Sequence, residues 1–376
     1  VMGYKEGEAT PQQLEEMKQI VREGMEAGAA GLTTGLIYPT GNLTGTKELT
    51  ELCKAIAPYN GIYCTHMRDE ADHIIEALDE ALYIARHSGA RLIISHHKIT
   101  GVDNIGLSEK TLSMIDQANL SGMDVYLDQY PYDAGATTLM SALPPQYVGD
   151  SRLLVQNLKD PAFRAKVKED IESAKKGGLA AGIAHIMIGG MDCHPSYVGR
   201  SPVEIGKDEG RDPYDVLFDA IIESDAEAKG IFFSISQDDM LRIMRHPRTM
   251  FGTDSPRATY FNTFGHPRAY GTFAQILTKY VRDDKIITLP EFVRRACTLP
   301  AQILGIKKGQ IRKGYDADVL VLDLDHMKAL SSYTNSDGKN KGFRYVIVNG
   351  RIAVENDRCT GELAGKLVRI CHNELK

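Results

Sequence analysis

The chain has 376 residues, with 44 Lys and Arg against 50 Asp and Glu, and a formal net charge of −6. This length predicts two domains or one large α/β barrel with additions, and the acidic balance gives no reason to expect nucleic acid or an anionic membrane as a partner. Six cysteines without paired spacing favour a reducing compartment, so we expect a cytoplasmic protein.

Helical and strand signals alternate through roughly the first two thirds of the chain, which indicates βα units and a parallel sheet. Thr10 and Pro11 predict the start of the first helix as its N-cap and first-turn proline. A later helix, with an apolar side that begins at Ile74, is predicted to end at Gly89. Strands are predicted at residues 31–36, 61–66, 91–96 and 123–128.

The alternation breaks from about residue 135 to 210, and we expect an insertion there that covers the top of the sheet. The last strand before the tail is predicted at 250–254, and two helices follow at roughly 271–283 and 290–304. The barrel portion is thus expected over residues 1–306. About five βα strands are found in it, whereas a closed barrel needs eight, so either some strands lack a clear signal or the chain holds only part of a barrel.

Residues 307–376 are predicted to form a small antiparallel β module. A short apolar strand is expected at 318–323. Two further apolar runs, 345–348 and 351–354, flank Asn349 and Gly350. Asn-Gly between such runs is among the strongest short signals of a β-hairpin.

Three predicted strands end in potential metal ligands: His66, His96 and Asp254. In a βα barrel these ends meet at the active site. Two imidazoles and a carboxylate suit zinc, which keeps one position open for water at a catalytic site. Each residue alone also has an ordinary structural explanation, as a hydrogen-bonded histidine or a capping aspartate. Because all three residues lie at strand ends, a metal site explains them as well as these structural roles do.

Lys98 lies two residues after His96. Side chains alternate along a strand, so the two residues are expected on one face. Lys98 would then meet an anionic group near the metal, and the alternative is a solvated lysine at a strand end.

Several motifs together resemble those of the N-acyl-D-amino acid deacylases (D-aminoacylases) of the amidohydrolase superfamily. The match is specific as an ordered set and extends over nearly the whole chain. It includes two histidine motifs, a tyrosine motif, an aspartate motif, an arginine motif and the re-entry into a C-terminal β-sandwich, at residues 65–70, 94–98, 128–132, 251–254, 265–273 and 309–318.

The resemblance implies a fold, an activity and residue roles. The fold is a (β/α) TIM-type barrel with a C-terminal β-sandwich portion, and the activity is zinc-dependent hydrolysis of N-acyl-D-amino acids, which are small-molecule substrates. His66 and His96 would hold the zinc ion, and Asp254 would lie beside it and transfer protons. The residues implied to grip the substrate's α-carboxylate are Lys98, Tyr130 and Arg268.

The family also has a first barrel strand with a His-x-His pair, followed by a cysteine metal ligand, and no His-x-His occurs in this sequence. We therefore expect a barrel that is incomplete at its N-terminal side. At position 136 Ala136 stands where many relatives have a hydroxyl residue, so a different substrate preference is expected. Two other functions stay open. One is a cyclic-amide hydrolase of the dihydroorotase or hydantoinase kind, for whose carboxylated lysine we find no good candidate, and the other is a barrel fragment without catalytic activity.

Overall fold

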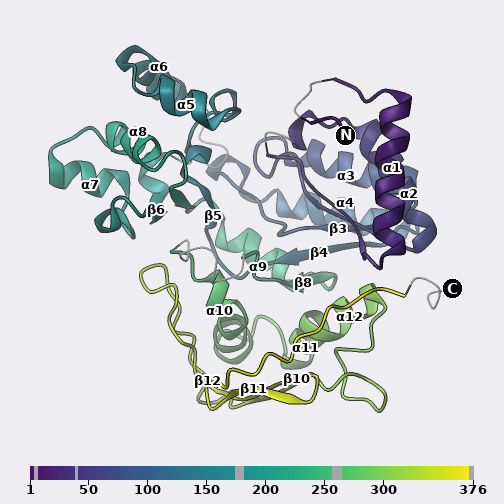
Figure 1. Ribbon diagram of the computed structural model, residues 1–376. Helices are drawn as coiled ribbons and strands as arrows, with labels where there is room; N and C mark the ends of the chain where they lie inside the picture. Colours follow the sequence, from purple (N-terminus) through teal and green to yellow (C-terminus); the bar gives the residue numbers. More distant parts are fainter. Residues whose placement is uncertain (4–6, 39–40, 174–181, 256–264, 372–376) are drawn as a thin grey trace.

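The computed structural model describes residues 1–3, 7–38, 41–173, 182–255 and 265–371. Its largest sheet has five parallel strands in the order β1-β2-β3-β4-β8. Each strand pairs in parallel with the next strand of this order (Figure 1). The strands are β1 (Gly31–Gly35), β2 (Ile62–His66), β3 (Arg91–Ile94), β4 (Val125–Gln129) and β8 (Thr249–Phe251).

A row of helices packs on one face of this sheet, each against the next, as in a series of βα units. They are α1 (Pro11–Glu26), α2 (Thr46–Ile56), α3 (Ile74–Ser88), α4 (Ser108–Leu120) and α9 (Gln237–Arg245). Their apolar sides and the sheet enclose one core, in which Ile56, Leu78 and Leu92 are fully buried. The helix signals in the sequence are confirmed: Thr10 forms a capping box with Gln13 ahead of α1, and Gly89, with a φ of 76°, ends α3.

A second, three-stranded antiparallel sheet interrupts the βα series, in the order β5-β7-β6. Its strands are β5 (Gly135–Thr138), β6 (Ile186–Gly190) and β7 (Lys229–Phe232). Helices α5 (Ser151–Asn157), α6 (Pro161–Ser173), α7 (Pro202–Glu209) and α8 (Pro213–Glu223) share its core. The antiparallel sheet therefore extends beyond the expected insertion of 135–210, because β7 pairs with both β5 and β6.

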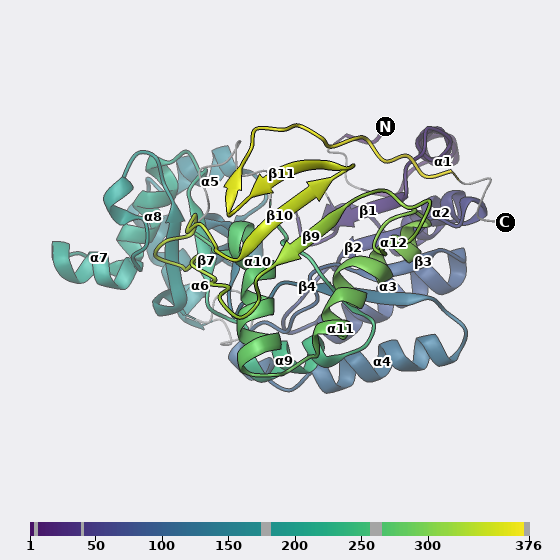
Figure 2. The same ribbon diagram turned by 90° about the horizontal axis from the view of Figure 1, so that it is seen from below.

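The C-terminal part of the chain carries helices and a separate four-stranded antiparallel sheet, β12-β11-β10-β9 (Figure 2). The helices are α10 (Arg268–Gln275), α11 (Leu289–Val293) and α12 (Leu299–Leu304), joined by π-helical turns at Ile276–Asp283 and Arg294–Thr298. The strands are β9 (Val319–Leu322), β10 (Phe343–Val348), β11 (Arg351–Glu355) and β12 (Arg358–Cys359). The predicted hairpin is confirmed: Val348 pairs with Arg351 across Asn349 and Gly350.

The sequence predicts about five βα strands, and the parallel sheet has five. Among the described residues, its end strands β1 and β8 each pair with one neighbour only. α12 packs on residues of the other sheet face, including Ile62 and Ile93. No helix in the described ranges is long and apolar enough to cross a membrane.

Candidate active site

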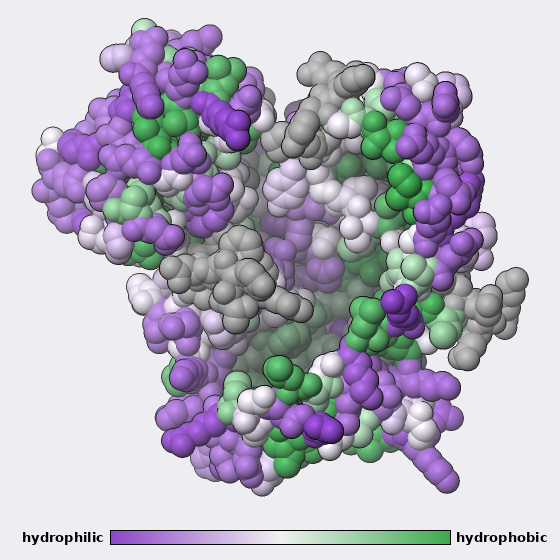
Figure 3. Space-filling model, viewed as in Figure 1, coloured by the Kyte–Doolittle hydropathy of each residue, from purple (hydrophilic) through white to green (hydrophobic). Residues whose placement is uncertain are grey.

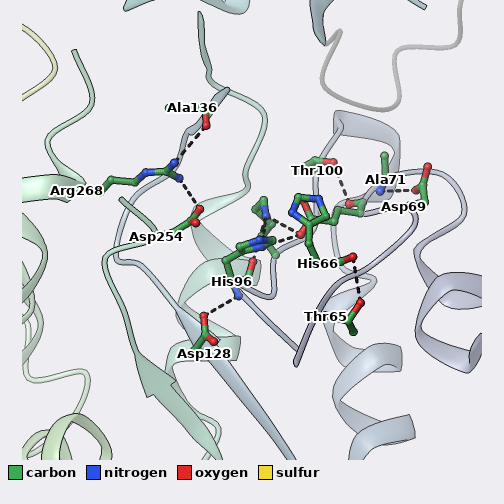
Figure 4. Close-up of polar contacts among 12 residues, drawn as sticks. Thr65, His66, Asp69, Ala71, His96, Thr100, Asp128, Ala136, Asp254 and Arg268 are labelled. Carbon is green, nitrogen blue, oxygen red and sulfur yellow. Dashed lines mark hydrogen bonds and ion pairs between the residues drawn. The ribbon is translucent and has the colours of Figure 1, made fainter. Parts of the chain in front are cut away.

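Two histidines and an aspartate lie at the carboxyl-terminal edge of the parallel sheet. His66 is the last residue of β2, His96 follows the end of β3, and Asp254 follows the end of β8. The ring centroids of His66 and His96 are 4.4 Å apart. Figure 4 shows the two rings beside each other, with Asp254 between His96 and Arg268. The structure thus brings His66 and His96 together, whereas Asp254 pairs with Arg268.

The backbone turns sharply at two of these positions. His96 has a φ of 38° and Asp254 a φ of 45°, a left-handed conformation that is uncommon for residues other than glycine. The carboxylate of Asp128 holds the turn at His96, because its Oδ1 accepts the His96 backbone N–H at 2.7 Å. Such backbone outliers cluster at functional sites.

The same turn corrects the strand argument for Lys98. β3 ends at Ile94, so the alternation of strand side chains does not extend to His96 and Lys98. Lys98 nevertheless lies beside His96, with its Nζ 2.9 Å from His96 Nδ1. The turn after the strand brings the two side chains together.

Glu70 completes a compact group with the two histidines. Single ligand atoms of His66, Glu70 and His96 all lie within 4.8 Å of one another. Glu70 Oε1 is 3.0 Å from His96 Nδ1 and accepts Lys98 Nζ at 2.6 Å, and Glu70 Oε2 is 3.7 Å from His66 Nε2. Asp254 lies outside this group. Sequence reasoning missed Glu70, although it stands four residues after His66 in the first histidine motif.

Burial and charge set the protonation of this group. Burial lowers the pKa of His66 to about 4, against the opposing charge of Glu70. Burial alone would raise the pKa of Glu70, but the charge of Lys98 opposes burial most strongly, and this pKa lies well below its usual range. For Lys98, burial lowers the pKa, and the carboxylate of Glu70 more than compensates. The site therefore combines a neutral His66 imidazole, an ionised carboxylate and a buried cation.

These residues fit a zinc ion. His66 Nε2 is buried and has no hydrogen-bond partner among the described residues, as expected of a nitrogen whose lone pair is kept for a metal. Zinc is bound by neutral imidazole and carboxylate, and a set of two histidines and a glutamate is a known catalytic donor set.

Arg268, Lys98 and Tyr130 lie next to this group. Arg268 is buried, and it donates to Asp254 Oδ2 at 2.8 Å and to the carbonyl of Ala136 at 3.2 Å. Its guanidinium lies 4.9 Å from the centre of the Tyr130 ring, and Lys98 Nζ lies 5.9 Å from it. The Tyr130 hydroxyl is buried without a hydrogen-bond partner in the described part of the chain. The structure therefore gathers the three residues that the resemblance assigned to a substrate carboxylate, and their role stays a prediction.

The surface is hollowed between the part with α5–α8, the part with α1–α4 and the C-terminal part (Figure 3). Purple, pale and green residues are all visible inside this hollow, so hydrophilic and hydrophobic residues both line it.

A solved structure of a D-aminoacylase variant in complex with copper chloride superposes on this chain with a TM-score of 0.77 and 30% identity, over 96% of this chain and 67% of that one. This chain belongs to the D-aminoacylase family of amidohydrolases. Its parallel sheet is accordingly part of a TIM-type barrel.

Other members of the D-aminoacylase family are also similar to this chain. A D-aminoacylase of Alcaligenes xylosoxydans xylosoxydans is 31% identical over 96% of this chain. The N-acyl-D-glutamate deacylase of Bordetella bronchiseptica, solved with zinc and a phosphonate inhibitor that mimics the tetrahedral intermediate, gives a TM-score of 0.75 at 29% identity, over 92% of this chain and 64% of that one. The Amidohydrolase family profile matches residues 199–354. This chain spans 65% of the length of the Alcaligenes enzyme.

Proposed function

We propose that the protein hydrolyses the amide bond of N-acyl-D-amino acids, with zinc as its cofactor, to a D-amino acid and a carboxylate. The observation that carries this proposal is the group of His66, Glu70 and His96 beside the Asp254–Arg268 pair. One part offers metal ligands, and the other offers a carboxylate and a cation. The names of the relatives, D-aminoacylase and N-acyl-D-glutamate deacylase, point to the same reaction.

Each residue has a separate task in this reaction. His66 and His96, with Glu70 as a third donor, would hold a zinc ion that supplies Lewis-acid polarisation of the amide carbonyl. Asp254 takes a proton from the attacking water and passes it to the nitrogen that leaves when the C–N bond breaks.

The substrate's free carboxylate is bound outside the metal group. Lys98 and Arg268 supply the positive charges, and the unpartnered hydroxyl of Tyr130 supplies a donor. Fixing both the carboxylate and the scissile amide leaves only one direction for the side chain on the α-carbon, which is the physical basis for selecting one hand of the substrate. Arg268 shares its guanidinium with Asp254, so binding and proton transfer are coupled at this pair.

We place this reaction in the cytoplasm, on a small-molecule substrate. All six cysteines are free, which suits a reducing compartment.

The test uses the purified chain with zinc. We expect one bound zinc per chain and release of free D-leucine, but not L-leucine, from the N-acetyl compounds. His66→Ala should abolish zinc binding and turnover, whereas His194→Ala, which removes a surface histidine paired with Glu223, should change neither. Hydrolysis of dihydroorotate or hydantoin in place of N-acetyl-D-leucine would reassign the protein to the cyclic-amide hydrolases. Zinc binding with no hydrolysis would indicate the inactive alternative.

A further inference from the structure

The connection between β9 and β10 leaves the C-terminal sheet and contacts α10, the helix that begins with Arg268; in Figure 1 a yellow-green loop extends from the sheet in this direction. Asn340 Nδ2 in this connection donates to the carbonyl of Tyr270 at 2.7 Å. A side chain at Gly271 would place its Cβ 2.9 Å from Cβ of Ser331. Only glycine allows so close an approach, so the connection packs directly on the first turn of α10.

Tyr333, in the same connection, touches three separate segments of the barrel side. Its hydroxyl donates to Asp133 Oδ1 at 2.8 Å, just after β4. Its ring centre lies 4.9 Å from that of Phe233, after β7, and 5.2 Å from that of His266, before α10. The tilts of 66° and 78° are edge-to-face arrangements, which aromatic pairs prefer. One side chain of the C-terminal sheet region thus joins the ends of three segments.

His266 connects Tyr333 to Arg268. Its Nε2 donates to the carbonyl of Ala134 at 2.9 Å, and its Nδ1 accepts the backbone N–H of Arg268 at 3.1 Å. An imidazole that donates through one nitrogen and accepts through the other is neutral, in agreement with burial, which lowers the pKa of His266 to about 3. The orientation of this ring therefore fixes the position of the Arg268 backbone amide.

We propose that Tyr333 is a positioning residue for Arg268: packed edge-on against His266, it orients the imidazole that holds the Arg268 backbone, and so aims the guanidinium at the site. The inference rests on the proposed function only in that the guanidinium receives a substrate carboxylate. It assigns a part in substrate recognition to the C-terminal β module, through a residue that does not touch the substrate.

The first test measures carboxylate recognition without turnover, by calorimetry in the presence of zinc. D-leucine and D-leucinamide are product-like ligands that differ only in the carboxylate. The wild-type protein is expected to prefer D-leucine. Tyr333→Leu should reduce this preference by about tenfold, the value of one charged hydrogen bond that is no longer well aligned. Tyr333→Phe keeps the ring and should keep most of the preference. The control is Tyr345→Leu, a half-buried tyrosine of β10 in the same module, which should leave the preference unchanged.

The second test is hydrogen exchange of the same variants, which does not depend on any substrate. The Arg268 amide, bonded to His266 Nδ1, should exchange faster in Tyr333→Leu than in Tyr345→Leu. Unchanged exchange at Arg268, or an unchanged ligand preference in a wild-type protein that does discriminate, would overturn the role of Tyr333. A wild-type protein with no preference for D-leucine would instead contradict the proposed carboxylate site, and the exchange data would then decide the role of Tyr333 alone.

Discussion

At the scale of single residues, Glu70 is the side chain on which the charges of the site converge. Its buried carboxylate faces both histidines and Lys98. An ionised group is stable in such surroundings only when cations compensate for the water it has lost. The carboxylate therefore serves two purposes: it is a donor for a metal, and it keeps a buried lysine charged.

Glu70→Gln tests both purposes. Glutamine has the same shape but no charge, so Lys98 is left without a compensating anion and the metal loses its anionic donor. We expect zinc affinity to fall at least about tenfold, as for other changes in the close environment of a metal, and the free energy of unfolding to fall by about 3 kcal/mol, because one partner of a buried pair is removed. Zinc titration and chemical denaturation measure the two effects.

The matched control is Glu80→Gln, which removes a carboxylate that pairs with Arg68 and is not part of the group of His66, Glu70 and His96. It should leave zinc affinity unchanged. An equal loss of zinc affinity in both variants would show that Glu70 has no specific role at the metal.

Arg268→Lys tests the carboxylate site. A lysine ammonium is a compact point charge and lacks the planar fork whose two nitrogens donate to Asp254 and to the Ala136 carbonyl. For N-acetyl-D-leucine we expect kcat/KM to fall at least about tenfold, since a charged contact contributes about 1.5–3 kcal/mol. Arg294→Lys, at a surface arginine that donates to the carbonyl of Pro247, is the control and should keep full activity. An unchanged kcat/KM in Arg268→Lys would exclude the proposed role.

At the scale of elements, local signals and the observed structure agree where one short segment decides the conformation. The turn between β10 and β11 is an example. Asn349 and Gly350 have φ values of 48° and 78°, as a tight hairpin turn of the mirror-image type requires. At Gly24 in helix α1, by contrast, the structure does not require glycine. Gly24 is exposed, and a Cβ added there would meet no other atom within 4 Å.

The two glycines predict stability changes of opposite sign. Gly350→Ala forces a side chain into the left-handed region and should lower the free energy of unfolding by about 1 kcal/mol. Gly24→Ala should raise it by about 0.5–1 kcal/mol, because alanine is the better helix former. Denaturant unfolding of the two single variants checks both values, and two changes of the same sign would contradict the backbone argument.

At the scale of the whole molecule, the candidate metal site joins segments that are distant in the chain. His66 and Glu70 come from the end of β2 and the segment after it, and His96 comes from the segment after β3. A metal ion bound there would link two neighbouring βα units. Because only folding brings these ligands together, the ion would bind the folded chain and not the unfolded one. Zinc should therefore stabilise the fold as well as supply chemistry.

Thermal unfolding with and without zinc tests this linkage. At a free zinc concentration of about 100 times Kd, binding contributes about 2.7 kcal/mol, which for a protein of this size is a rise in Tm of about 3 °C. A chelator should reverse the rise, and His96→Ala should show none. A similar rise in His96→Ala would mean that zinc stabilises the protein at another place.

Features that depend only on neighbouring residues could be predicted from the sequence. Local propensity and periodicity predict the capping box at Thr10, the end of α3 at Gly89 and the hairpin at Asn349. They also predict the parallel strands β1 and β2, the second of which ends at His66. Strand ends also indicated His66, His96 and Asp254, because parallel strands bring their carboxyl ends to one edge.

Features that depend on contacts between distant segments become visible only in the folded chain. No periodicity shows that Glu70 turns toward both histidines, that β7 pairs with β5 and β6, or that Tyr333 reaches His266 from the C-terminal module. The left-handed turn at His96 was also unforeseen, because the Asp128 carboxylate that holds it lies 32 residues further along the chain. Local sequence encodes backbone preference, whereas the positions of charged and aromatic side chains are set by partners that folding alone brings together.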